Sequence, residues 1–64
     1  MVMHYAMFIS PGNREPVYIR PTAVLRIKKD PTHGYTVLDL ISGMQVVEGS
    51  LDEAVKALRV AEEQ

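Results

Sequence analysis

The stretch that decides the fold is residues 35–47, which read Tyr35-Thr36-Val37-Leu38-Asp39-Leu40-Ile41-Ser42-Gly43-Met44-Gln45-Val46-Val47. Two runs rich in β-branched and large apolar residues flank Ser42-Gly43, a dipeptide that is typical of a short turn. The sequence therefore predicts a β-hairpin here, and the other elements are placed relative to it.

Both faces of this hairpin carry large apolar side chains. A two-residue loop at Ser42-Gly43 would place Ile41 opposite Met44, and cross-strand partners share a face. A bulge at Gly43 would exchange the faces of one strand without making either face fully polar. A half-exposed antiparallel sheet normally has one polar face. The two faces would hold Thr36, Leu38, Leu40, Gln45 and Val47 on one side, and Tyr35, Val37, Asp39, Ile41, Met44, Val46 and Glu48 on the other.

Three further strands are expected before the hairpin, because strand-forming residues gather in three segments. Pro16 and Pro21 bracket the second segment, and since proline cannot donate to a neighbouring strand they favour an edge position or a strand start. Residues 30–34 contain the Asp, Pro and Gly of a turn. The three segments are residues 2–9, 17–20 and 22–29.

A C-terminal helix is expected after Ser50, which can cap it while Glu53 completes a capping box. Leu51, Val55 and Leu58 then recur at helical spacing, with Ala54 and Ala61 beside them, and form an apolar stripe. The predicted fold class is α+β: a four- to five-stranded antiparallel sheet, a β-meander, with one C-terminal helix packed on one face.

Length and composition favour a single domain, residues 1–64, that associates with copies of itself. A domain of this size hides only about 60% of its unfolded surface. Small domains therefore often need a disulfide, a metal or a partner, and this chain has no cysteine and no Cys/His set for zinc. One helix covers one face of a sheet, so we expect the other face to be an interface, carried by Tyr35, Val37, Ile41, Met44 and Val46.

The charge distribution is uneven although the net charge is −1. Residues 1–29 hold five basic residues and one acidic residue, a net charge of +4, whereas residues 30–64 hold two basic and seven acidic residues, a net charge of −5. This asymmetry fits an anion-binding face, subunits that meet through opposite charges, or an ordinary acidic helix surface. We expect a cytoplasmic location, because no convincing signal peptide or membrane-span pattern is present.

The residues needed for catalysis do not form a credible set. There is no cysteine, the three serines lie in predicted turns or at the helix cap, and two histidines are too few for a metal site. Asp39 is an acid among apolar neighbours, and such a residue more often pairs with an arginine across the sheet or an interface. We therefore expect no enzyme activity, no cofactor and no bound metal.

One aromatic ring and three cations on the second and third predicted strands form the pattern most typical of a binding surface. Within each strand the two polar residues share a face, and Leu25 and Ile27 take the other face of the third strand. If the two parities coincide, this face can hold a nucleotide or phosphate by charge and stacking. The pattern also fits a solvated sheet face. The four residues are Tyr18, Arg20, Arg26 and Lys28.

Five short motifs between residues 16 and 59 resemble the small FlbD-like proteins of bacterial flagellar operons. The motifs are Val17-Tyr18-Ile19-Arg20-Pro21, Val24-Leu25-Arg26-Ile27, Thr36-Val37-Leu38-Asp39-Leu40-Ile41-Ser42-Gly43, Val46-Val47-Glu48 and Ser50-Leu51-Asp52-Glu53-Ala54-Val55. The resemblance covers about two-thirds of the chain, while the first strand and residues 28–34 depart from the pattern. It implies a non-enzymatic accessory protein and transfers no catalytic residue.

Three functions remain open at this point. We expect a non-catalytic, homo-oligomeric interaction or adaptor module that binds a protein partner. The alternative is an oligomeric protein that binds or sequesters an anionic ligand such as a nucleotide, as a phage protein or a sensor would. A weak nucleic-acid-binding regulator is the third and least favoured, because the chain lacks a basic balance.

Overall fold

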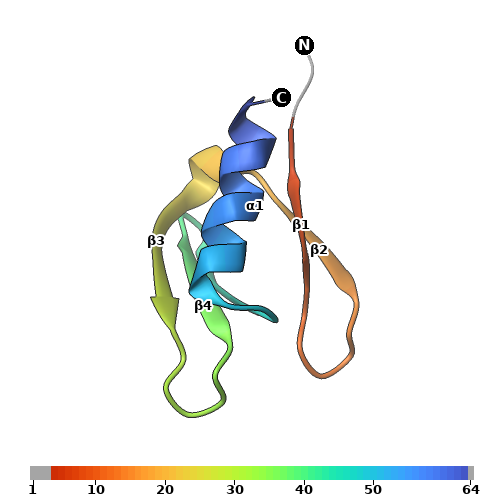
Figure 1. The fold of residues 1–64 in the computed structure, drawn as a ribbon, viewed down its shortest axis with the longest axis vertical. Coiled ribbons are helices and arrows are strands. Elements are labelled where there is room, and N and C mark those ends of the chain that lie inside the picture. Colours follow the sequence, from red (N-terminus) through yellow and green to blue (C-terminus); the bar gives the residue numbers. More distant parts are fainter. Residues whose placement is uncertain (1–3, 64) are drawn as a thin grey trace.

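The computed structural model describes residues 4–63, which form five strands, a short 3-10 helix and one α-helix. Figure 1 shows α1 in front, with the β1–β2 hairpin on its right and β3 and β4 on its left. The elements are β1 (Ala6–Ile9), β2 (Pro16–Ile19), η1 (Pro21–Ala23), β3 (Val24–Lys29), β4 (Thr36–Leu40), β5 (Gly43–Val47) and α1 (Leu51–Glu63).

The strands form two antiparallel sheets, β1-β2 and β3-β4-β5. The α+β class with a C-terminal helix is therefore confirmed, whereas the expectation of one four- to five-stranded sheet is wrong. The break falls at Pro21, which begins η1 and has no N–H to donate, so β2 and β3 do not pair. The first strand begins at Ala6, and residues 2–3 of its expected range lie outside the described residues.

The hairpin between β4 and β5 turns through Ile41 and Ser42, because Leu40 pairs with Gly43. The expected loop at Ser42-Gly43 is thus displaced. Gly43 adopts a φ of 145°. The Ile41 N–H donates to Ala23 O at 3.1 Å, so the turn is hydrogen-bonded to the residue that precedes β3. The register differs from the expected one by two residues, so every side chain keeps the face that the sequence predicted.

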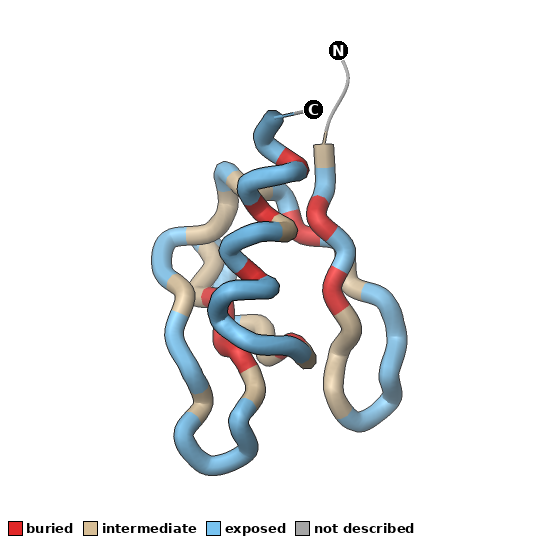
Figure 2. The backbone as a smooth tube through the Cα atoms, in the orientation of Figure 1, coloured by how far each residue is buried: buried red, intermediate tan, exposed pale blue. Residues whose placement is uncertain are grey.

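The core lies where the inner faces of both sheets meet α1. Leu38 and Val47 are fully buried on the inner face of the three-stranded sheet, and Phe8 is buried on the inner face of the hairpin. Figure 2 shows buried positions on α1, on β1 and in the strands behind the helix. The remaining members of this cluster are Ala6, Ile19, Ala54, Leu58 and Ala61.

The buried stripe of α1 runs through Ala54, Leu58 and Ala61 rather than through Leu51, Val55 and Leu58. Leu51 and Val55 are 37% and 40% exposed. The smaller side chains face inward, because the helix must approach two sheets at once and alanine leaves room for both. The expected stripe was therefore correct in its spacing and wrong in its centre.

The start of α1 follows the predicted capping box. The Glu53 N–H donates to Ser50 Oγ and the Ser50 N–H donates to Glu53 Oε1, each at 3.1 Å. The buried Thr36 hydroxyl donates to Gly49 O at 2.8 Å and joins β4 to the segment before the helix. The local cap and one tertiary hydrogen bond therefore fix the same end of α1.

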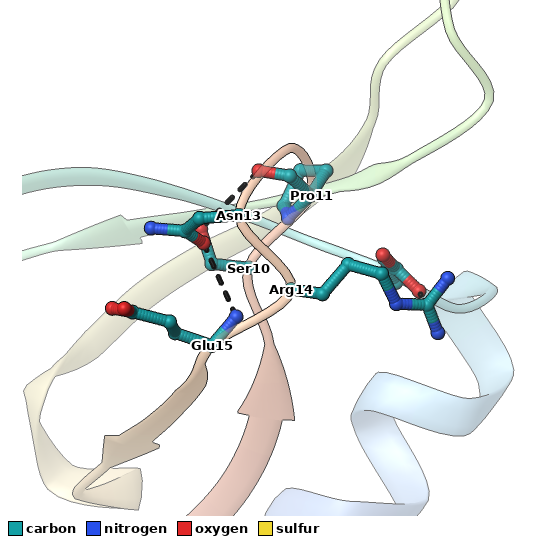
Figure 3. Close-up of polar contacts among 6 residues, drawn as sticks. Ser10, Pro11, Asn13, Arg14 and Glu15 are labelled. Carbon is teal, nitrogen blue, oxygen red and sulfur yellow. Dashed lines mark hydrogen bonds and ion pairs between the residues drawn. The ribbon is translucent and has the colours of Figure 1, made fainter.

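Glu48 connects the two sheets. Its N–H donates to Ile9 O at 2.8 Å, and its carboxylate lies 3.8 Å from the Arg14 guanidinium. Figure 3 shows Arg14 reaching from the β1–β2 loop towards this segment. The loop is closed by the Ser10 N–H, which donates to Glu15 O at 2.9 Å, and by the Glu15 N–H, which donates to Asn13 Oδ1 at 3.2 Å.

We predict that Leu38→Ala lowers the free energy of unfolding by about 2–5 kcal/mol, because it removes a fully buried side chain shared by both layers. Leu25→Ala makes the same chemical change at a residue that is 69% exposed, and it should cost less than about 0.5 kcal/mol. Urea unfolding at one protein concentration measures both. Equal losses for the two variants would contradict this description of the core.

Candidate interaction surfaces

The outer face of the three-stranded sheet is a small grid of paired side chains on the side away from α1. One row is formed by Val37 between Lys28 and Val46, and the next by Asp39 between Arg26 and Met44. Val37 is buried but lies outside the main core cluster. The grid therefore has an apolar side towards β5 and a cationic side along β3.

Asp39 is the centre of the charged part of this grid. Arg26 Nε donates to its Oδ2 at 2.7 Å, and Lys28 Nζ lies 3.9 Å from the same oxygen. The pairing of Asp39 with an arginine across the sheet is thus confirmed. Its other oxygen, Oδ1, is buried without a hydrogen-bond donor among the described residues. A buried acceptor without a donor lowers the stability of the folded state by about 1–3 kcal/mol.

The five expected interface residues all fall on or at the ends of this outer face. Val37 and Val46 are cross-strand neighbours, and Met44 is 70% exposed beside Asp39. Ile41 lies in the β4–β5 turn and is 73% exposed. Tyr35 lies at the opposite end, half-buried and stacked on His33 with ring centroids 6.1 Å apart. The exposed apolar surface is therefore concentrated at the Ile41 and Met44 end.

The four expected ligand-binding residues are divided between the two sheets. Tyr18 belongs to β2, where it lies opposite Met7, and Arg20 follows the same strand. Arg26 and Lys28 belong to β3, where both contact Asp39. The expectation rested on β2 and β3 sharing one sheet, and they do not. What the β1–β2 hairpin presents instead is exposed Tyr18 and Arg20 together with Met7 and Tyr5.

A groove between β3 and α1 is a surface that the sequence did not predict. It has a volume of about 500 Å³ and is lined by apolar side chains that include Ile27, Val55 and Leu58, with Arg26 and Arg59 among its charged residues. The register of β3 shifts between Val24 and Arg26, which leaves Leu25 unpaired and 69% exposed. The alternation of β3 alone gave no signal of this bulge.

The polar residues in the 30–34 turn have a local structural role. The Thr32 N–H donates to Asp30 Oδ1 at 3.0 Å, and His33 Nδ1 lies 3.0 Å from Asp30 Oδ2. The hydrogen bond from Thr32, followed by the contact with His33, holds the pKa of Asp30 below its ordinary value.

Within residues 4–63, no group of three His, Asp or Glu side chains lies close enough together to hold a metal ion. Within the same residues, no helix has both the length and the apolar character that a membrane span requires.

We predict that Asp30 stabilises the folded state above a pH of about 3.9, its ordinary pKa, and that this contribution is lost as the pH falls through the lower folded pKa. Asp30→Asn should therefore be less stable than the parent at pH 6, and the difference should shrink on acidification. Carboxyl chemical shifts measure the pKa, and denaturant unfolding measures stability. Titration of Asp30 at or above its ordinary pKa would contradict the turn geometry.

No protein-family model, no curated protein and no solved structure matches the chain. The resemblance to FlbD-like proteins therefore stays a prediction, and the two strongest surfaces remain the outer face of the β3–β5 sheet and the groove beside β3.

Proposed function

We propose that this chain is a non-catalytic interaction module that self-associates through the outer face of the β3–β5 sheet and binds a protein partner. The observation that carries the proposal is the exposure of Ile41 and Met44 beside the apolar pair Val37 and Val46. Large exposed apolar side chains that adjoin an apolar pair on one face are typical of a surface that another chain covers.

The small size of the core supports self-association. Among residues 4–63, nine apolar residues are buried, and three of them are alanines that contribute little apolar area. No disulfide is present to compensate, because the chain has no cysteine. Covering the outer face would add apolar burial to a domain whose length places it near the lower limit of independent stability.

Magnitudes indicate how much of the face must be covered. Full burial of a side chain such as Ile or Met contributes about 1.5–3 kcal/mol. Ile41 and Met44 from two copies would then contribute roughly 6–12 kcal/mol at most, while association costs about 4–15 kcal/mol before any gain. These two residues alone therefore support weak association. A stable oligomer also needs cover over Val46 and Tyr35, which are half-buried in the single chain.

A non-catalytic role agrees with the positions of the groups that could act as nucleophile or base. The Ser10 hydroxyl donates to Pro11 O at 3.5 Å, and the Ser50 hydroxyl accepts the helix-capping hydrogen bond from Glu53. His33 is held by Asp30 in an exposed turn. We extend the proposal to a cytoplasmic accessory role of the FlbD-like kind.

Nucleotide binding is a second candidate, favoured by the β1–β2 hairpin. Tyr18 is 62% exposed opposite Met7, and Arg20 lies at the same end of the hairpin as Tyr5. A base can stack on an exposed tyrosine while an arginine contacts a phosphate. Arg26 and Lys28 no longer belong to this set, because Asp39 pairs with both.

We predict that the parent protein forms an oligomer at micromolar concentration and that Met44→Glu shifts it towards the monomer, because a carboxylate on the outer face would be buried. Leu25→Glu is the matched control, since Leu25 has nearly the same exposure but lies at the β3 bulge. Sedimentation velocity measures the mass of each variant. A parent protein that stays monomeric would remove the self-association proposal.

We predict, for the second candidate, that a bound nucleotide stabilises the protein through Tyr18. At a ligand concentration about 100-fold above Kd the gain would be about 2.7 kcal/mol, which raises Tm by about 10 °C or more in a domain of this size. A thermal-shift panel of mononucleotides and cyclic dinucleotides tests this, with Tyr18→Ala as the variant and Tyr35→Ala as the control. No shift with any member of the panel would exclude the candidate.

A further inference from the structure

We propose that the outer face of the β1–β2 hairpin binds two successive bases of a single-stranded nucleic acid, one on Tyr18 and one on Tyr5, with the linking phosphate on Arg20. This inference rests on the second candidate function, nucleotide binding, and names the ligand class that the same face would take. It combines three features: two exposed aromatic rings on neighbouring chains, a cation beside both rings, and a groove along β1.

The first feature is the grid of four side chains on the outer face of the hairpin. Met7 pairs with Tyr18, and the residues one step beyond the last pair of the hairpin are Tyr5 and Arg20. The backbone of Arg20 is still extended, with φ −76° and ψ 129°, so its side chain shares the face of Tyr18. Tyr5, Met7 and Tyr18 are 46%, 54% and 62% exposed. The grid therefore lies open to a ligand.

The two rings lie on one diagonal of this grid. Diagonal neighbours on the face of an antiparallel pair are about 7–8 Å apart, which is within reach of aromatic side chains. Aromatic residues on adjacent strands are a known support for successive bases of a splayed single strand, because each base stacks on a ring of its own. Tyr18 and Tyr5 therefore provide two base positions. Stacking of this kind accepts any base, so we expect little sequence preference.

The second feature is the position of Arg20, which lies opposite Tyr5 and two residues from Tyr18. The other side chain beside both rings is Met7, which is apolar. A phosphate that joins two stacked bases would lie next to one of these two residues, and charge favours Arg20. Arg20 forms no ion pair with any residue in the range 4–63, and residues 5–9 and 16–20 contain no acid.

The third feature is a groove of about 520 Å³ between β1 and α1, which adjoins the face at Tyr5 and Met7 (Figure 1). Val60 adds to its apolar lining, and Lys56 adds a cation that forms no ion pair within residues 4–63. Glu53 also lines the groove, and its Oε1 is engaged in the helix cap. A base on Tyr5 would therefore have apolar side chains beside it, and Lys56 offers the strand a second cation.

Charge selects this occupant over a second copy of the chain. The hairpin face carries a cation and no acid, so it cannot offer an identical face a complementary charge. A nucleic acid supplies flat apolar bases together with a negative charge between them. The groove beside β3 differs, because Arg59 and Glu62 both line it and its charge favours no class of partner. Since the net charge of the chain is −1, the contact should be local and limited to a short segment.

The number of bases is tested by comparing the dinucleotide dTpdT with thymidine 5′-monophosphate in NMR titrations of the parent protein. A second stacked base should make the dinucleotide bind at least about tenfold more tightly. Equal affinities would overturn the two-base site. That result would leave the nucleotide candidate standing, provided that the monophosphate binds through Tyr18.

The role of Arg20 is tested by neutralising the linking phosphate. A dinucleotide with a methylphosphonate linkage should bind the parent more weakly than dTpdT, whereas Arg20→Gln should bind the two with equal, reduced affinity. The slope of log K against log salt should also become shallower by about 0.7 in Arg20→Gln. Arg59→Gln is the matched control and should behave like the parent. The same loss on neutralisation in Arg20→Gln as in the parent would overturn Arg20 as the phosphate contact.

The two base positions are tested one at a time. Tyr5→Ala and Tyr18→Ala should each weaken dTpdT binding by about tenfold, because each removes one stacked base. Tyr5→Phe and Tyr18→Phe keep the ring and should retain most of the affinity, and Tyr35→Ala is the control elsewhere in the chain. Unchanged binding in either alanine variant would overturn that position. A change of oligomeric mass in place of a loss of binding would assign the face to contact between copies and overturn the inference.

A single-stranded hexanucleotide of dT distinguishes a strand from a free dinucleotide as the source of the two bases. It should bind about fivefold more tightly than dTpdT, because six bases contain five successive pairs. Binding of dTpdT with exclusion of the hexanucleotide would overturn the strand as the ligand. A protein that binds none of these probes would overturn this inference and the nucleotide candidate together, while self-association would still be decided by the mass of the parent.

Discussion

The structure depends on the packing of one small-residue stripe of α1 against two separate sheets. Ala54 and Ala61 lie on this stripe with Leu58 between them, and the buried residues of both sheets belong to the same cluster. Within residues 4–63, the Glu48 N–H joins the sheets directly by donating to Ile9 O. The helix therefore acts as the common layer, and the short side chains of alanine allow it to approach both sheets closely.

This packing determines which surfaces remain for other molecules. Because the inner faces of both sheets are directed at α1, the outer faces and the free strand edges stay at the surface. Leu51 and Val55 are also left partly exposed, since the buried stripe is centred on Ala54 and Leu58. The exposed flank of α1 at Val55 then forms one side of the groove whose other side is β3. The orientation of α1 about its own axis, which directs Ala54, Leu58 and Ala61 into the core, thus also places Val55 at the groove.

The sequence predicted features that depend on local chemistry and parity, and it missed those that depend on long-range geometry. The capping box at Ser50 and the two hairpin faces were correct, the faces because a register slip of two residues preserves parity. The number of sheets was wrong because Pro21 and η1 separate β2 from β3. The joint ligand set failed for the same reason, and the β3 bulge breaks an alternation that looked regular.

Ion pairs within the fold account for part of the uneven charge along the chain. Arg14 contacts Glu48, and Arg26 and Lys28 contact Asp39, so cations from the first half are matched by acids from the second half. Part of the asymmetry therefore stabilises the fold rather than attracting a ligand. The cations that form no ion pair with another residue in the range 4–63 are distributed unequally: Arg20 lies at one end of the β1–β2 hairpin, Lys29 lies on β3, and Lys56 and Arg59 lie on α1. The ion pairs of Arg26 and Lys28 with Asp39 thus lie beside the apolar part of the outer face, Val37, Met44 and Val46, on one sheet.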